Sequence, residues 1–171
     1  MDLILIVLRL THILAGIFWA GAAVLAAAFL VPAVRATGPE GGKFMQQLIQ
    51  KQGLSTYISI AAWLSTLAGL ALYWRASLGL QLAWILAPSG LTLTIGAVAG
   101  ILAAIMGAMV NAPTATRMSA LAKEMESAGG PPKPEQIAEM QKLQVRLGQA
   151  GVWAAVLLVI ASAAMAIARY V

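Results

Sequence analysis

The residue best suited to chemistry in this sequence is His12, the only histidine, which lies in the stretch LRLTHILAGIFWAG at residues 8–21. Arg9, His12, Gly16 and Trp19 recur at intervals of three or four residues, so they share one face of a helix. An imidazole can ligate a metal, exchange hydrogen bonds or move a proton. Ionisable side chains inside an apolar segment are candidates for function.

Two interpretations of His12 stay open. In the first, neutral His12 hydrogen-bonds to a serine or threonine of another helix, and Arg9 reaches outward to lipid headgroups. In the second, His12 ligates haem b or copper, with Met165 as a second ligand and Arg9 holding a haem propionate. Because there is one histidine, a bis-histidine haem would need a second copy of the chain. A protein without any cofactor fits the same residues.

The distance of His12 from the outer end of its helix predicts which residues of the other helices lie at the same level in the membrane. Its position is about 13 Å from the outer end of its helix at 1.5 Å rise per residue. The same depth in the other apolar segments corresponds to Ser65 or Thr66 and to Ser162 or Met165. We therefore expect hydroxyls and a thioether around the imidazole.

Other chemistry is scarce in this chain. It has no cysteine, which excludes thiolate metal sites and cysteine nucleophiles. All acidic residues fall outside the apolar segments, and no phosphate-binding loop, zinc signature or nucleophile–base pair is visible. We assign no catalytic residue and expect a non-enzymatic protein. An enzyme for a lipid-soluble substrate would have to rely on His12 alone for proton transfer.

The composition indicates a membrane protein, because 61% of the 171 residues are hydrophobic and only 10% are charged. Four apolar segments are long enough to cross a bilayer as helices, and they do not alternate as barrel strands would. Pro32 lies near the exit of the first, and the sequence NAP closes the third. The predicted fold is a single all-α domain over 1–171, an integral membrane four-helix bundle with spans at about 3–34, 55–74, 91–112 and 151–170.

The basic residues predict the orientation. Eight of the eleven lie in two loops, leaving Arg9, Arg75 and Arg169 for the other side. The positive-inside rule makes both loops cytoplasmic and both termini external. The net charge of +5 is explained by the basic residues of the two cytoplasmic loops. It does not indicate nucleic-acid binding, and we expect no nucleic-acid partner.

Both cytoplasmic loops show helical periodicity. Residues 40–52 have apolar and basic faces, which is typical of an interfacial amphipathic helix. Around GGPPKP, residues 113–148 repeat apolar positions at helical spacing on both sides. We expect helices three and four to continue into a cytoplasmic helical hairpin, which is either a self-contained stalk or a docking surface.

Small residues recur on the third segment, where Gly96, Gly100, Ala104 and Ala108 are four residues apart. Small residues let membrane helices approach closely. The stripe serves packing inside the bundle or a homo-oligomer interface. Besides the bilayer, the expected partners are therefore a second copy or a larger membrane complex, in which the chain would be a structural or accessory subunit.

The motif HILAGIFWAG, with His12, Gly16, Trp19 and Gly21, resembles the opening of bacterial copper-resistance D proteins and related uncharacterised four-span membrane families. It is more distantly similar to small cytochrome b561-type haem proteins. The resemblance implies copper handling or haem binding, with His12 as the position that carries over. Those haem proteins use further histidines in other helices, which this chain lacks.

Overall fold

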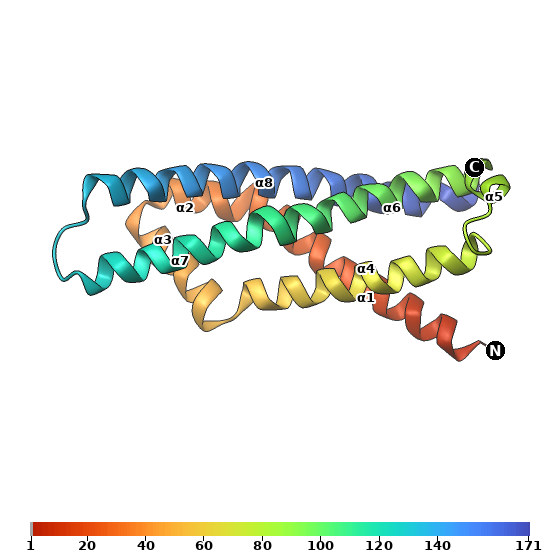
Figure 1. Cartoon of the computed structure of the whole chain (residues 1–171), viewed down its shortest axis with the longest axis horizontal. Coiled ribbons are helices and arrows are strands. Elements are labelled where there is room, and N and C mark those ends of the chain that lie inside the picture. The colour runs from red at the N-terminus through yellow and green to blue at the C-terminus, as the bar shows by residue number, and fades with distance from the viewer. Residues whose placement is uncertain (1) are drawn as a thin grey trace.

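The computed structural model describes residues 2–171, and within that range it contains helices and turns but no strand (Figure 1). Four helical segments are long and apolar enough to cross a membrane. The predicted all-helical class and the four candidate spans are confirmed. The observed segments are Leu3–Thr37, Leu54–Ala76, Pro88–Ser127 and Pro134–Tyr170.

The first and third segments each contain a π-helical turn followed by a proline. The first consists of α1 (Leu3–Leu25), η1 (Ala26–Leu30) and α2 (Val31–Thr37), and the third of α6 (Pro88–Met106), η3 (Gly107–Asn111) and α7 (Ala112–Ser127). Proline lacks a backbone N–H but is accepted in the first turn of a helix, and π-helical turns are a recognised site of helix bending. The sequence predicts that the first and third membrane spans end near Pro32 and Pro113 and that the third helix continues beyond its span. In the structure both helices continue past their prolines.

The remaining elements of residues 2–171 are two further long helices and four short helical elements that adjoin the long ones. They are α3 (Pro39–Gln46), η2 (Gln47–Lys51), α4 (Leu54–Ala76), α5 (Leu82–Leu86), α8 (Pro134–Ile167) and η4 (Ala168–Tyr170). The pair α3 and η2 occupies the segment predicted to be amphipathic. Helix α7 packs against α8, and Arg117 donates to both carboxylate oxygens of Glu139 at 2.8 and 3.1 Å.

The four long helices pack most closely as two pairs, α1 with α4 and α6 with α8, and further contacts join α1 to α8 and α4 to α6. One residue from each long helix meets in a shared buried cluster, formed by Trp19, Ala61, Ala103 and Leu158. Most of the buried apolar side chains are alanines. Without a hydrophobic drive between helices in lipid, such close backbone approach provides the van der Waals contact that holds a bundle together.

Helix α1 crosses the molecule obliquely (Figure 1). Its N-terminal half diverges from the C-terminal end of α8, so that the N- and C-termini are separated at the same end of the molecule. This half of α1 is held by α4, and an ion pair between Asp2 and Arg75 joins the outer ends of the two helices. The surroundings of His12 are therefore set by the α1–α4 pair.

Candidate functional site

The imidazole of His12 is hydrogen-bonded to the backbone of α4. Its Nδ1 lies 2.8 Å from the carbonyl oxygen of Ser65. A carbonyl oxygen can only accept a hydrogen bond, so Nδ1 carries the proton and donates it. In the neutral ring this leaves the lone pair on Nε2 as the free acceptor or ligand position.

Ser65 returns the interaction to α1. Its side chain is 4% exposed, and its hydroxyl donates to the carbonyl oxygen of His12 at 3.1 Å. The same hydroxyl oxygen lies 3.3 Å from Nδ1 of His12. Each of the two residues thus donates to the backbone carbonyl of the other, and we call this arrangement the His12–Ser65 clamp.

Two glycines make room for the clamp. A Cβ at Gly69 would lie 2.8 Å from Cε1 and 2.9 Å from Nδ1 of His12, and a Cβ at Gly16 would lie 3.1 Å from the Ser65 hydroxyl oxygen. Gly69 follows Ser65 by one helical turn, and Gly16 follows His12 by one turn. Gly69 therefore leaves space for the His12 ring to reach the Ser65 carbonyl, and Gly16 leaves space for the Ser65 hydroxyl to reach the His12 carbonyl. The clamp needs both glycines.

Counting residues from the helix ends predicts Ser65 or Thr66 as the partner of His12 on the second span. In the structure the partner is Ser65. The hydroxyl oxygen of Thr66 is buried and has no hydrogen-bond partner among residues 2–171. Gly69 was not expected at the site. The signal for it is the repeated pattern of a polar residue followed four positions later by glycine, His12 to Gly16 and Ser65 to Gly69.

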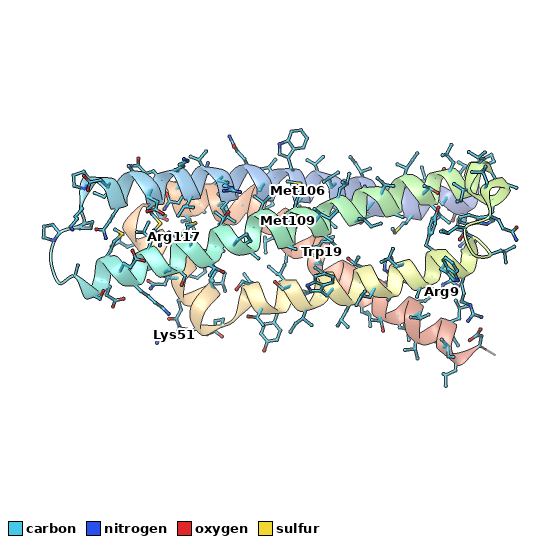
Figure 2. The ribbon with its side chains drawn as sticks, viewed as in Figure 1. Arg9, Trp19, Lys51, Met106, Met109 and Arg117 are labelled. Atoms are coloured by element: carbon cyan, nitrogen blue, oxygen red, sulfur yellow. The ribbon has the colours of Figure 1, made fainter. Side chains whose placement is uncertain are left out.

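Arg9 lies on α1 one turn before His12, and its side chain is exposed. Figure 2 shows it in the N-terminal half of α1, the part that diverges from α8. Within the part of the chain that the structure describes, the ion pair at this end of the molecule joins Asp2 to Arg75 and leaves Arg9 out. Its exposure suits a side chain that extends toward lipid headgroups.

Met165 and Ser162 lie on α8, the other predicted neighbour. Ser162 is exposed. Met165 is half-buried, and its Cγ lies 3.3 Å from the position that a Cβ would take at Gly96 of α6. Met165 thus belongs to the α6–α8 contact, whereas His12 belongs to the α1–α4 contact.

The donor atoms at the site bear on which cofactor could be held. No group of three or more His, Cys, Asp or Glu side chains able to hold a metal ion occurs among the described residues. His12 offers one strong ligand through Nε2, while its Nδ1–H is oriented by a backbone carbonyl, as is usual for metal-ligating histidines. His12 would supply a single ligand, and a complete haem or copper site would need a further donor.

Comparisons with protein-family models, with curated proteins and with solved structures found no match. Function is therefore to be inferred from the helices and from the His12–Ser65 clamp. These two features describe an apolar four-span chain in which the one histidine joins two helices.

Proposed function

We propose that the chain is a non-enzymatic integral membrane protein that acts as a structural or accessory subunit of a self-associated or larger membrane complex. The observation that carries this proposal is the clamp, because His12 uses its Nδ1–H to join α1 to α4. Polar bonds between membrane helices stabilise their association. The single histidine then has a packing role that needs no substrate.

The proposed orientation puts both basic loops in the cytoplasm and both termini outside a bacterial inner membrane. The loop between the first two spans contains Arg35, Lys43 and Lys51, and the positive-inside rule places such loops in the cytoplasm. This matches the expected attraction between basic segments and an anionic cytoplasmic leaflet.

The same orientation makes α7 and the first half of α8 a cytoplasmic hairpin. The helical segment Pro88–Ser127 has 40 residues. At 1.5 Å per residue it extends about 60 Å, roughly twice the thickness of the hydrocarbon core. The excess length, with its Arg117–Glu139 pair, supports a stalk that projects from the membrane and presents a surface to a partner.

A deletion tests the accessory role. Replacing residues 118–146 with a short Gly–Ser linker should lower the number of copies in the native particle of the detergent-purified protein or release a co-purifying chain, while the spans stay folded. The matched control replaces only 129–132 at the tip of the loop, and its mass should equal that of the wild type. An equal number of copies per particle in all three proteins, with no partner in any, would reject the docking role.

A second candidate function is cofactor binding, favoured by the oriented Nδ1–H of His12. Under this proposal Nε2 of His12 would ligate haem b or copper, and His12 of a second copy would supply the other donor. Met165 of the same chain packs at Gly96 in the α6–α8 contact instead. Haem would bring redox activity, and copper a transfer or storage role. In either case the chain's own part is to hold the imidazole in one tautomer through the carbonyl of Ser65.

Absorption spectra of oxidised and reduced protein, with metal analysis of the same sample, test the cofactor proposal. A Soret band or stoichiometric copper should vanish in His12→Ala and persist in Lys123→Gln, a charge change at an exposed position of α7. The signal should also persist in Met165→Leu, and its loss there would contradict a second copy as the source of the other donor. A colourless, metal-free wild-type protein would refute cofactor binding and leave the clamp as the role of His12.

A further inference from the structure

An open groove runs between α1 and α4 and ends at η2. Its volume is about 600 Å³. Its walls are almost entirely apolar, and α1 contributes Leu14 and Phe18 while α4 contributes Tyr57, Ile60 and Leu64. These five side chains are 45–64% exposed, so the groove is open to whatever surrounds the helices.

The groove changes character at its η2 end. There the lining residues are Leu48, Gln52 and Leu54, with the ring of Tyr57 one turn further along α4. Lys51 immediately precedes Gln52 and is exposed. Figure 2 shows Lys51 on the outside of the molecule, at the turn that joins η2 to α4. The groove thus has a long apolar part and an end lined by the Gln52 amide and the Tyr57 ring. Lys51 is next to Gln52 in sequence and lies just outside this lining.

A second groove offers a comparison. It lies between α1 with η1 and α8, has a volume of about 360 Å³, and is lined only by valine, alanine and isoleucine. No polar or charged residue lines it, so nothing in it selects a headgroup. The two grooves differ in the feature that would distinguish a specific lipid from the bulk.

We propose that the α1–α4 groove binds one anionic phospholipid, with an acyl chain along the apolar part and the phosphate beside Lys51 and Gln52. The lining residues of α4 span from Leu54 to Leu64. Ten residues of helix extend about 15 Å, which equals half of a hydrocarbon core of about 30 Å. The groove therefore matches the depth of one leaflet.

Charge complementarity identifies the leaflet and the lipid. The inference rests on the membrane orientation given under the proposed function, in which the η2 end faces the cytoplasm. The cytoplasmic leaflet is the one rich in anionic lipid, and basic residues near its surface attract such headgroups. Lys43, also exposed on α3, adds a second cation to the same segment.

Native mass spectrometry on the full chain tests the proposal. The protein is released from nanodiscs of phosphatidylcholine containing phosphatidylglycerol, and the lipids retained on each protein are identified. Wild type should retain one phosphatidylglycerol in preference to phosphatidylcholine. Lys51→Gln should weaken this retention about fivefold, the effect of roughly 1 kcal/mol for one basic residue at an anionic surface.

Matched variants separate the groove from general surface charge. Lys123→Gln removes the same charge from an exposed position on α7. This variant should retain as much phosphatidylglycerol as the wild type. Ile60→Trp should fill the groove and reduce retention, whereas Val159→Trp, in the second groove, should not. If Ile60→Trp does not fold, Leu64→Phe replaces it.

The proposal is overturned if both lipids are retained equally by wild type, or if Lys51→Gln and Lys123→Gln lower retention by the same factor. It is also overturned if the groove-filling variant retains as much phosphatidylglycerol as wild type. None of these measurements depends on the cytoplasmic hairpin or on a cofactor. Failure here is therefore distinct from failure of the accessory or cofactor role.

Discussion

Replacing Gly69 with alanine should destabilise the protein only while His12 is present. The new Cβ would lie 2.8 Å from Cε1 and 2.9 Å from Nδ1 of the imidazole, which real Cβ atoms do not tolerate. The ring must therefore move, and moving it breaks the 2.8 Å hydrogen bond to Ser65. The loss of stability should therefore come from breaking the His12–Ser65 clamp, and not from the change of glycine to alanine by itself.

The expected size follows from three effects. Overpacking in a well-packed interface costs about 1–3 kcal/mol, and the lost bond between membrane helices costs about 0.6 kcal/mol. Alanine in place of a helical glycine returns roughly 0.5–1 kcal/mol. We expect Gly69→Ala to lower the free energy of unfolding by about 1–3 kcal/mol in the wild-type background.

In the His12→Ala background the clash and the hydrogen bond are both absent, so only the gain from alanine remains. There Gly69→Ala should stabilise the protein by roughly 0.5–1 kcal/mol, which gives a coupling energy of at least about 1.5 kcal/mol between the two positions. The assay is reversible unfolding in mixed micelles, followed by helical circular dichroism. Gly21→Ala is the control, because a Cβ at Gly21 meets no atom within 4 Å.

An equal cost of Gly69→Ala in both backgrounds would refute the reasoning. It would mean that the imidazole does not lie over Gly69 and that the clamp is not formed. A cost at Gly21→Ala as large as at Gly69→Ala would also refute it, because the penalty would then come from helix glycines in general.

Three further predictions concern the rest of the fold. Gly96→Val should lower the free energy of unfolding by about 1–3 kcal/mol, because a Cβ at Gly96 already lies 3.2 Å from the Ala161 carbonyl oxygen; Gly100→Ala, at 3.9 Å from the Cβ of the same residue, should be tolerated. Thermal unfolding compares the two, and equal losses would contradict the α6–α8 packing. Glu139→Gln should cost at most about 1 kcal/mol, since it removes an exposed ion pair, and a larger loss on chemical unfolding would give this pair a greater role. In this cysteine-free chain, Ala128→Cys should react with an impermeant maleimide only in inverted vesicles and Leu78→Cys only in intact spheroplasts; the reverse pattern would invert the proposed topology.

Much of the helix content follows from the sequence because a bilayer imposes a minimum length. Apolar runs of about 20 residues identify the four candidate spans, and the structure contains a helix at each. Their ends are less predictable. Pro32 and Pro113 mark the predicted ends of two spans but not the ends of the helices, because a proline in the first turn of a helix is accepted and the helix continues after a π-helical turn.

The sequence predicts which residues lie at the same level as His12 along the helix axes, but not which of them face it. A fixed rise per residue brings Ser65 and Met165 to the level of His12. Which side of each helix faces His12 depends on rotation about the helix axis, and a span that is apolar all round carries little signal for it. Ser65 faces the imidazole, whereas Met165 packs at Gly96, because α1 diverges from α8 at that end.

The pairing of neighbouring helices has a consequence for biosynthesis. His12 and Ser65 are 53 residues apart, so α1 and α4 can join in the membrane before α6 leaves the ribosome. The second pair, α6 with α8, closes through its own connection in the same way, and each pair contains a π-helical turn followed by a proline. The ribosome thus delivers two successive hairpins to the bilayer, and the shared cluster around Trp19 and Leu158 can form only after the last helix has been inserted.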